Sequence, residues 1–267
     1  MKKYIFLAFA FVSFLSCSRD EDKSETPENG CNIVTAKTQN YQFDDVIIST
    51  SGFDINFNRF FFEYDSQRRI NKITGGLVGS PPGDLGGFYL SNKASDEITY
   101  SGNTVLVKVS ANMTIRPYDK EFVIENDRII SQKVTSKYPF QTSDPVTYLY
   151  EYCSNQILEK VNSRLTKTIT VENGNLSKVI KWRYSLDGNI NGKTEIIYSD
   201  YDNQENLLKG KFFINGAFYS AFSNNIYNKI DSKTYDLLNG TYVFNGNYFN
   251  TTYDPASTSN YFEKNCN

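Results

Sequence analysis

The sequence of 267 residues contains no histidine, one Trp, two Met and four Cys. Without histidine, no mechanism that needs an imidazole base or an imidazole metal ligand is available. The 28 Lys and Arg residues are balanced by 30 Asp and Glu residues, so the net charge is −2. The basic footprint of a nucleic-acid-binding protein is therefore missing. We expect no metal site, no cofactor and no nucleic-acid partner.

Long apolar runs are missing except at the N-terminus. Two lysines, Lys2 and Lys3, precede an apolar run from Tyr4 to Leu15. This run of about a dozen residues is short for a bilayer span, which needs roughly 20, and is typical of the apolar region of a secretory signal. A cut after Ser16 would place bulky Phe14 at the third position before it, where ordinary signal peptidase sites have small residues. We predict a lipoprotein signal peptide over residues 1–16.

The stretch Phe14-Leu15-Ser16-Cys17 resembles a lipobox, which implies that Cys17 is lipidated and becomes the membrane-anchored N-terminus. Residues 17–31 are polar and predict a disordered tether. Its acidic cluster, residues 20–22, resembles the surface-export signal of Bacteroidetes lipoproteins and implies an outer-membrane protein that faces the cell surface. A merely solvating linker, with the domain facing the periplasm, is the alternative.

With Cys17 lipidated, three cysteines remain, Cys31, Cys153 and Cys266. An odd number in an oxidising compartment predicts one disulfide and one free thiol. A bridge between Cys31 and Cys266 would join the two ends of the domain, and chain-entropy models credit so long a loop with up to about 5 kcal/mol. Cys153 is the alternative partner. A catalytic thiol would have no imidazole to activate it.

The sequence is rich in aromatic residues, with 20 Tyr and 20 Phe. From residue 41 onward, short alternating apolar runs are separated by turn dipeptides, and no segment has sustained helical periodicity. We therefore predict one all-β domain, residues 32–267, in which successive antiparallel hairpins form a barrel-like or strongly curved sheet around an aromatic interior. The turn dipeptides are Asn173-Gly174, Asp187-Gly188, Asn191-Gly192, Asn215-Gly216, Asn239-Gly240 and Asn245-Gly246.

A loose repeat of strand, polar turn and strand runs through these hairpins. Its first copy contains Tyr64-Asp65 followed by Arg69-Ile70 and resembles the YD repeat of bacterial surface proteins, with Arg68 where that repeat usually has Gly. The predicted copies are Phe60 to Ile73, Ile98 to Val109, Glu121 to Val134, Thr147 to Val161, Thr168 to Ile180 and Thr194 to Leu208.

Two later elements, Ser223 to Ile226 and Tyr253-Asp254, join the lipobox and the hairpins in a wider resemblance. Together they are similar to a Bacteroidetes lipoprotein family of unknown function with a porin-like β fold, over residues 41 to 266. The resemblance implies an all-β fold. That family carries no established activity, so no site residue can be transferred from it.

Two segments invite a functional interpretation. A Gly- and Pro-rich stretch, Gly75 to Gly87, predicts a long loop, and no phosphate-binding Lys follows its glycines. Asp200, Asp202, Asn203 and Glu205 crowd oxygen atoms together, yet their spacing fails the EF-hand pattern and predicts an acidic hairpin turn. The candidate recognition residues of the Gly- and Pro-rich loop are Gly75, Gly76, Gly79, Pro81, Pro82 and Gly83.

The leading interpretation is a non-enzymatic, membrane-tethered binding or structural lipoprotein, with a glycan or a protein as its ligand. The alternative is a hydrolase of envelope or other polysaccharides that uses paired carboxylates. Trp182, the single tryptophan, is thin provision for a sugar-stacking cleft. Two carboxylates about 5 to 10 Å apart in a deep cleft would favour the enzyme, whereas a filled interior would favour the scaffold.

Overall fold

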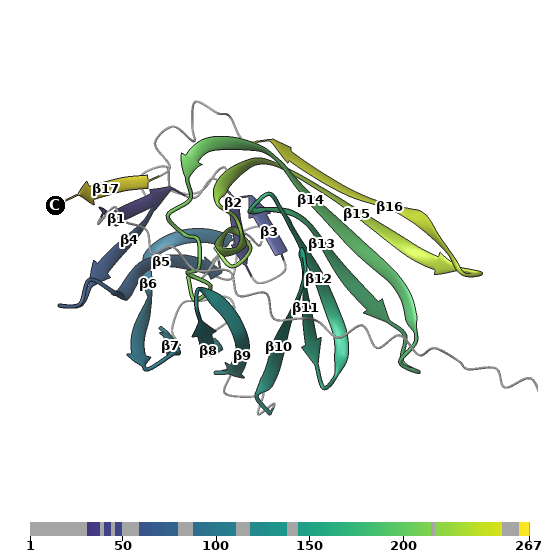
Figure 1. The fold of residues 1–267 in the computed structure, drawn as a ribbon, viewed down its shortest axis with the longest axis horizontal. Helices are drawn as coiled ribbons and strands as arrows, with labels where there is room; N and C mark the ends of the chain where they lie inside the picture. The colour runs from purple at the N-terminus through teal and green to yellow at the C-terminus, as the bar shows by residue number, and fades with distance from the viewer. Residues whose placement is uncertain are drawn as a thin grey trace, which may run out of the picture.

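The protein folds as one wide, strongly curved antiparallel sheet, which confirms the all-β fold class (Figure 1). The computed structural model describes residues 31–37, 40–43, 46–49, 59–79, 88–110, 118–137, 144–214, 217–252 and 262–266. Within these ranges the helical structure is a single 3-10 turn, η1 (Ser220–Phe222). No helix in the described ranges is long and apolar enough to cross a membrane.

Fifteen strands make up the main sheet, and the order in the sheet follows the chain from β4 to β16. At the other end, β1 pairs with β4 on one side and with β17 on the other, so both ends of the described chain lie in one sheet. A separate hairpin is formed by β2 (Asn40–Phe43) and β3 (Val46–Ser49). The main sheet contains β1 (Cys31–Lys37), β4 (Arg59–Tyr64), β5 (Ile70–Gly79), β6 (Phe88–Ser101), β7 (Thr104–Val109), β8 (Tyr118–Glu125), β9 (Arg128–Ser136), β10 (Val146–Cys153), β11 (Gln156–Val161), β12 (Arg164–Glu172), β13 (Asn175–Tyr184), β14 (Ile190–Glu205), β15 (Asn225–Leu238), β16 (Thr241–Thr252) and β17 (Phe262–Cys266).

Tight turns of Asn and Gly join several of these strands, as predicted. Asn173-Gly174 joins β12 to β13 with φ angles of 53° and 76°, and Asn239-Gly240 joins β15 to β16 with 50° and 77°. Two positive φ angles are what a two-residue hairpin turn requires, and Gly adopts them without a steric penalty. Gly188, with φ 86°, serves the turn between β13 and β14.

Two other predicted turns are wrong. Asn191-Gly192 lies inside β14, where the missing side chain of Gly192 lets Arg183 reach Tyr235 and Asp236 on β15. Asn245-Gly246 lies inside β16, at a register shift against β15 that marks a β-bulge. An Asn-Gly pair can mark a turn, but a glycine inside a strand can also allow another group to approach the backbone closely or can form a bulge. Asn215-Gly216 lies outside the described residues.

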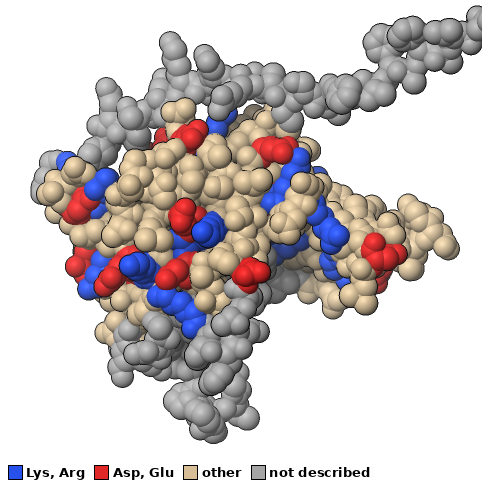
Figure 2. Space-filling model, turned by 90° about the horizontal axis from the view of Figure 1, so that it is seen from below, with Lys and Arg blue, Asp and Glu red and all other residues tan. Residues whose placement is uncertain are grey.

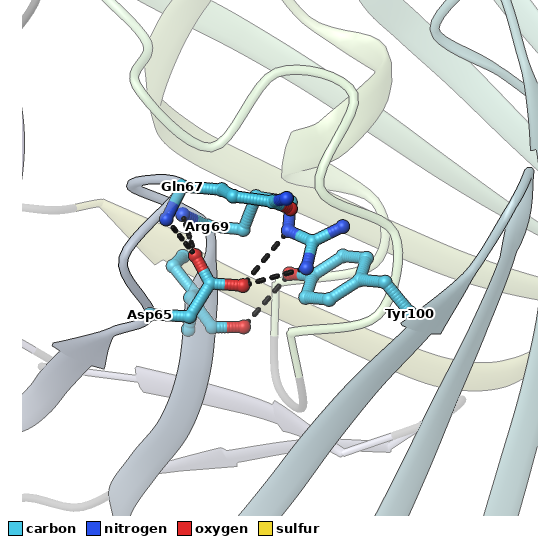
Figure 3. A network of polar contacts seen from close by, with 5 residues as sticks. Asp65, Gln67, Arg69 and Tyr100 are labelled. Carbon is cyan, nitrogen blue, oxygen red and sulfur yellow. Dashed lines mark hydrogen bonds and ion pairs between the residues drawn. The ribbon is translucent and has the colours of Figure 1, made fainter.

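The turn that contains Asp65 is held by an exposed network (Figure 3). Asp65 Oδ1 accepts hydrogen bonds from the backbone amides of Gln67 and Arg69, both at 2.9 Å, and Oδ2 accepts from Nε and Nη2 of Arg69 at 2.8 and 2.7 Å. The amide and then the side chain of Arg69 hold the pKa of Asp65 below its ordinary value. The guanidinium also lies 4.4 Å from the ring centre of Tyr100 on β6, so the turn is tied to a strand beyond its own hairpin.

The same five-residue turn occurs again at the other side of the sheet. In residues 65–69 and 185–189, the amide of the first residue donates to the carbonyl of the fifth at 2.9 Å, and the amide of the fourth donates to the carbonyl of the first at 3.0 Å. The fourth residue has a positive φ in both, 62° for Arg68 and 86° for Gly188. Residues 185–189 lie between the predicted copies Thr168 to Ile180 and Thr194 to Leu208, so this turn geometry is shared by two hairpins and is not a property of the repeat.

Five of the six predicted repeat copies fall on hairpins, from β4–β5 to β12–β13. The sixth, Thr194 to Leu208, is wrong because most of it belongs to the single long strand β14, which pairs with β15 as far as Glu205. Asp200 has a φ of 55° within this strand, so the acidic cluster bends a strand where a hairpin turn was predicted. Pairing with β15 overrides the local turn signal.

The concave side of the sheet is filled by the connection between β14 and β15, residues 206–214 and 217–224, called here the inner segment (Figure 1). Its buried side chains include Leu208, Phe212, Phe213, Tyr219 and Phe222. Ring contacts join this segment to three separated strands: Phe213 to Tyr100 of β6 at 6.0 Å, Phe218 to Tyr150 of β10 at 6.1 Å, and Tyr219 to Tyr198 of β14 at 6.2 Å. The hydrophobic core is therefore built between the curved sheet and this one connection.

Asparagine side chains fix the path of the inner segment. Asn206 Nδ2 donates to the carbonyls of Ser220 at 2.7 Å and Ser223 at 2.9 Å, which closes the segment on itself. At its far end, the amide of Asn224 donates to the carbonyl of Gly174 at 2.8 Å. The turn between β12 and β13 is thus one of the places where the segment is hydrogen-bonded to the sheet.

This junction predicts unequal costs for two otherwise similar substitutions. A Cβ on Gly174 would lie 2.1 Å from Asn224 Nδ2, whereas one on Gly240, which has nearly the same φ, meets nothing within 4 Å. We expect Gly240→Ala to lower the free energy of unfolding by about 1 kcal/mol through backbone strain alone. Gly174→Ala should cost at least about 1 kcal/mol more, because it also displaces Asn224. Equal losses in urea unfolding would contradict this junction.

Candidate functional site

The interior holds a buried carboxylate, Glu159 on β11, which is 1% exposed. Its oxygens accept hydrogen bonds from the hydroxyl of Tyr150 at 3.0 Å and of Thr166 at 2.7 Å, and Lys167 Nζ forms an ion pair with it at 3.0 Å. Burial raises the pKa of Tyr150 well above its ordinary value, and the charge of Glu159 adds to this. A carboxylate whose two oxygens are both satisfied in the core is a structural group, because a base would need a free oxygen facing its substrate.

A second buried carboxylate, Asp96 on β6, is 4% exposed. Burial raises its pKa to about 7, and the positive charge of Lys120, itself largely buried, opposes this shift. In the same region Lys137 Nζ lies 2.8 Å from Asp119 Oδ1 and 2.9 Å from the carbonyl oxygen of Val109. Asp96 is thus a buried carboxyl group whose pKa lies close to neutral pH.

The structure brings no buried pair of carboxylates together among the described residues. Asp96 and Glu159 are the two buried acids there, and four strands, β7 to β10, separate β6 from β11 in the sheet. The inner segment packs against both sides of this interval, at Tyr100 and at Tyr150. The described interior thus contains no buried carboxylate pair, and the inner segment fills it.

The raised pKa of Asp96 predicts how stability depends on pH. Between pH about 4 and about 7 the folded protein keeps a proton that the unfolded chain has lost, so this stabilising contribution is complete at the acid end and disappears as the pH rises through 7. In Asp96→Asn the contribution is absent. Across this window the wild type should lose stability relative to the variant by up to about 4 kcal/mol. Urea unfolding at several pH values measures the difference, and parallel curves would contradict it.

The outer face carries a row of large side chains across four neighbouring strands. The register pairs Trp182 of β13 with Lys193 of β14, Lys193 with Tyr235 of β15, and Tyr235 with Phe244 of β16. On β14, Tyr198 lies on the inner face, where it contacts the inner segment. Alternation along the strand therefore places Lys193, and with it the whole row, on the opposite face.

Five residues of this surface, Trp182, Lys193, Tyr235, Tyr242 and Phe244, are called here the aromatic patch. Lys193 Nζ lies 4.4 Å from the ring centre of Tyr242 and 5.5 Å from that of Tyr235. The rings of Trp182 and Tyr242 are 6.5 Å apart, and those of Tyr235 and Phe244 are 6.1 Å apart. Two rings, Tyr235 and Tyr242, thus contact one ammonium group by cation–π interactions, and each of them has a further aromatic ring beside it.

Hydrogen bonds and an ion pair orient the centre of the patch. The indole Nε1 of Trp182 donates to Thr168 Oγ1 at 3.1 Å, which sets the plane of the ring. Lys193 Nζ also forms an ion pair with Glu195 at 2.7 Å. The patch therefore combines apolar ring surface with polar groups at fixed positions, as ligand sites commonly do.

The β15–β16 hairpin carries further exposed apolar side chains, and they are distributed over both faces of the sheet. Phe244 is 47% exposed, Val243 45%, Tyr248 54% and Leu238 56%. This hairpin extends beyond its neighbours (Figure 1). Seen from below, Lys and Arg alternate with Asp and Glu over the body of the protein, whereas the projecting tip is largely uncharged (Figure 2). The end of the β15–β16 hairpin is therefore less charged than the body of the protein in that view.

The predicted recognition loop is placed differently by the structure. Gly75, Gly76 and Gly79 lie in β5, which pairs with β6 as far as Gly79, so the loop predicted from Gly75 onward is strand up to that residue. Gly75 has a φ of 123° at a register shift between Thr74 and Gly76, and it thus serves a bulge. The remaining loop candidates, Pro81, Pro82 and Gly83, lie outside the described residues.

The structure describes three of the four cysteines, Cys31, Cys153 and Cys266. Cys31 and Cys266 are direct partners in the antiparallel pair of β1 and β17. Cys153, at the end of β10, is disulfide-bonded rather than free, and its partner is not among the described side chains. The pairing of Cys31 with Cys266 and the alternative through Cys153 both stay predictions, as does the lipidation of Cys17, which lies outside the described residues. No group of three or more Cys, Asp or Glu in the described ranges is arranged to hold a metal ion.

No protein-family model and no curated protein sequence matches the chain. Among solved structures, it is similar to a porin-like protein from Bacteroides uniformis, with 10% identity, a TM-score of 0.41, and coverage of 83% of this chain and 96% of that one. It is also similar to a porin-like protein from Bacteroides vulgatus, with 12% identity, a TM-score of 0.43, and coverage of 84% and 99%. At this degree of likeness, any functional conclusion depends on the chain's own residues.

Sequence reasoning missed the aromatic patch. It assigned the alternating Tyr and Phe residues to the interior, and this holds for Tyr150, Tyr198 and Tyr219. The available signal was the pairing of aromatic and charged residues two apart, as in Lys233 and Tyr235, since a face that contains lysine is seldom a core face. The spacing within one strand shows which of its residues share a face. Only the register between strands shows that Trp182, Lys193, Tyr235 and Phe244 lie side by side.

Proposed function

We propose that this protein is a lipid-anchored protein of the outer membrane, facing the cell surface, whose role is to bind a ligand rather than to catalyse a reaction. The lipobox-like sequence at Cys17, the polar tether and its acidic cluster support the anchor and its orientation. The inner segment supports a binding role, because it fills the concave side where a barrel-like enzyme would place its cleft. The ligand surface is then the aromatic patch on the outer face.

The chemistry of the patch favours a glycan as the ligand. Sugar rings have apolar faces that stack on aromatic rings and hydroxyl groups that need donors and acceptors, and the patch offers both through its rings and through Lys193 with Glu195. Cores of protein–protein interfaces are enriched in Trp and Tyr but depleted in Lys and Glu. A charged pair at the centre of the aromatic surface therefore fits a hydroxyl-rich ligand better than a protein.

The single tryptophan provides a direct test of the patch. Oligosaccharides of glucose, mannose, xylose and N-acetylglucosamine are titrated while the fluorescence of Trp182 is recorded. We expect one class to change the emission, and Tyr242→Ala to weaken its binding at least about tenfold through the loss of one stacking ring.

The matched control is Phe61→Ala, which removes an exposed aromatic ring on β4, far along the sheet from the patch. It should leave the affinity unchanged. Equal weakening by both variants, or saturable binding of a protein ligand with no response to any of the glycans, would contradict the glycan assignment.

The anchor is tested separately. In cells fed a palmitate analogue, the wild type should be labelled and Cys17→Ala should not, because the thiol that accepts the lipid is gone. Protease added to intact cells should then remove the wild-type domain. A labelled protein that survives until the outer membrane is broken would keep the anchor but place the domain on the periplasmic side.

A further inference from the structure

We propose that the free edge strand β16 pairs antiparallel with β16 of a second copy of this chain, which forms a two-fold symmetric dimer. This inference concerns self-association and is independent of which ligand the aromatic patch binds. Within the described residues, β16 pairs with β15 alone, and β17 at the opposite end pairs with β1 alone, so the sheet has two edges (Figure 1). An edge strand presents backbone donors and acceptors that another strand can satisfy.

The first observation is the composition of β16. Its 12 residues, TYVFNGNYFNTT, include no charged residue and no proline. Natural edge strands are commonly protected against pairing by lysines, other charges, proline or a β-bulge. Of these, β16 has only the bulge at Asn245-Gly246, which leaves a regular stretch on either side. The opposite edge, β17, has five residues, of which Glu263 and Lys264 are charged. The two edges of the sheet therefore differ in how open they are to a new strand.

The second observation is that apolar side chains are exposed on both faces of β16. Phe244 belongs to the outer face, and Val243, the residue before it, belongs to the opposite face; they are 47% and 45% exposed. A ligand that lies on one face would cover only one of them. A strand added to the edge continues the sheet and brings side chains beside both, so strand addition explains both exposures together.

The absence of charge also selects the partner. A two-fold axis places a strand against itself, so every charged side chain near the axis would face its own copy across the interface. An uncharged strand avoids this repulsion whatever the register. Head-to-tail pairing of β16 with β17 of another copy would instead place the charged residues Glu263 and Lys264 beside an uncharged strand. The second copy therefore contributes its own β16.

The bulge divides the edge into two stretches, Thr241–Phe244 and Asn247–Thr252. The side-chain oxygen of Asn245 already accepts a hydrogen bond from the amide of Asn247 at 3.1 Å, so the strand is interrupted there. Val243 and Phe244, whose side chains are exposed on the two faces, lie in the first stretch, so the symmetry axis is placed within Thr241–Phe244. In this register the two aromatic patches, which both end at Phe244, lie next to each other on the same face of the joined sheet.

The mass of the full-length protein in detergent, measured by light scattering that separates protein from detergent, tests the dimer. We expect the wild type to be a dimer that dissociates on dilution. The double variant Val243→Lys/Phe244→Lys should dissociate at a concentration at least about tenfold higher, because the symmetry brings each new charge into the interface twice. The matched control is Leu149→Lys on β10, which charges a side chain that is 50% exposed but lies away from either edge. It should remain dimeric.

Circular dichroism checks that both lysine variants are folded, and hydrogen exchange provides a second measurement. Amides of β16 should exchange more slowly in the concentrated wild type than in the diluted one, while amides of β10 should not change. A wild type that is monomeric at the highest attainable concentration, or a double variant as dimeric as the wild type, overturns the proposal. Assemblies that grow without limit would show head-to-tail pairing and overturn it too. Trp182→Ala should leave the dimer intact, so failure of glycan binding and failure of pairing are distinguishable.

Discussion

The packing of the inner segment against the concave side of the sheet is the constraint on which the rest of the structure depends. An open, curved sheet of fifteen strands has an apolar face that must be covered. The inner segment covers this face, and its aromatic rings contact tyrosines on β6, β10 and β14. Because these strands are far apart in the sheet order, the same few side chains hold the curvature as well as the core.

Because the inner segment fills the interior, the buried carboxyl groups of Glu159 and Asp96 are enclosed by protein atoms. Glu159 is hydrogen-bonded and ion-paired at both oxygens, and Asp96 is buried with a pKa of about 7 in a region that also holds Lys120. Groups enclosed in this way adjust stability but do not meet a ligand. The groups that a ligand could reach therefore lie on the outer face, where Lys193 contacts the rings of Tyr235 and Tyr242 and Trp182 lies beside Tyr242.

The open edges are the second consequence of this architecture. A sheet that closed on itself would have no free strand, whereas this one ends in β16, which is long and uncharged. The ligand surface and the pairing edge meet at Phe244. A dimer joined there would present two patches on one surface, and two linked sites bind a repeating ligand such as a polysaccharide more tightly than either site alone.

The sequence by itself determined the local structure: the all-β class, the hairpin turns at Asn173-Gly174 and Asn239-Gly240, and the Asp65 turn follow from backbone preferences over a few residues. It misassigned Asn191-Gly192, Asn245-Gly246 and the Asp200 region, because pairing with a neighbouring strand overrides a local turn preference. Tertiary structure alone decided that the inner segment covers the concave side and that Trp182, Lys193, Tyr235 and Phe244 share a row. Those facts depend on the register between strands distant in sequence, which alternation within one strand does not contain.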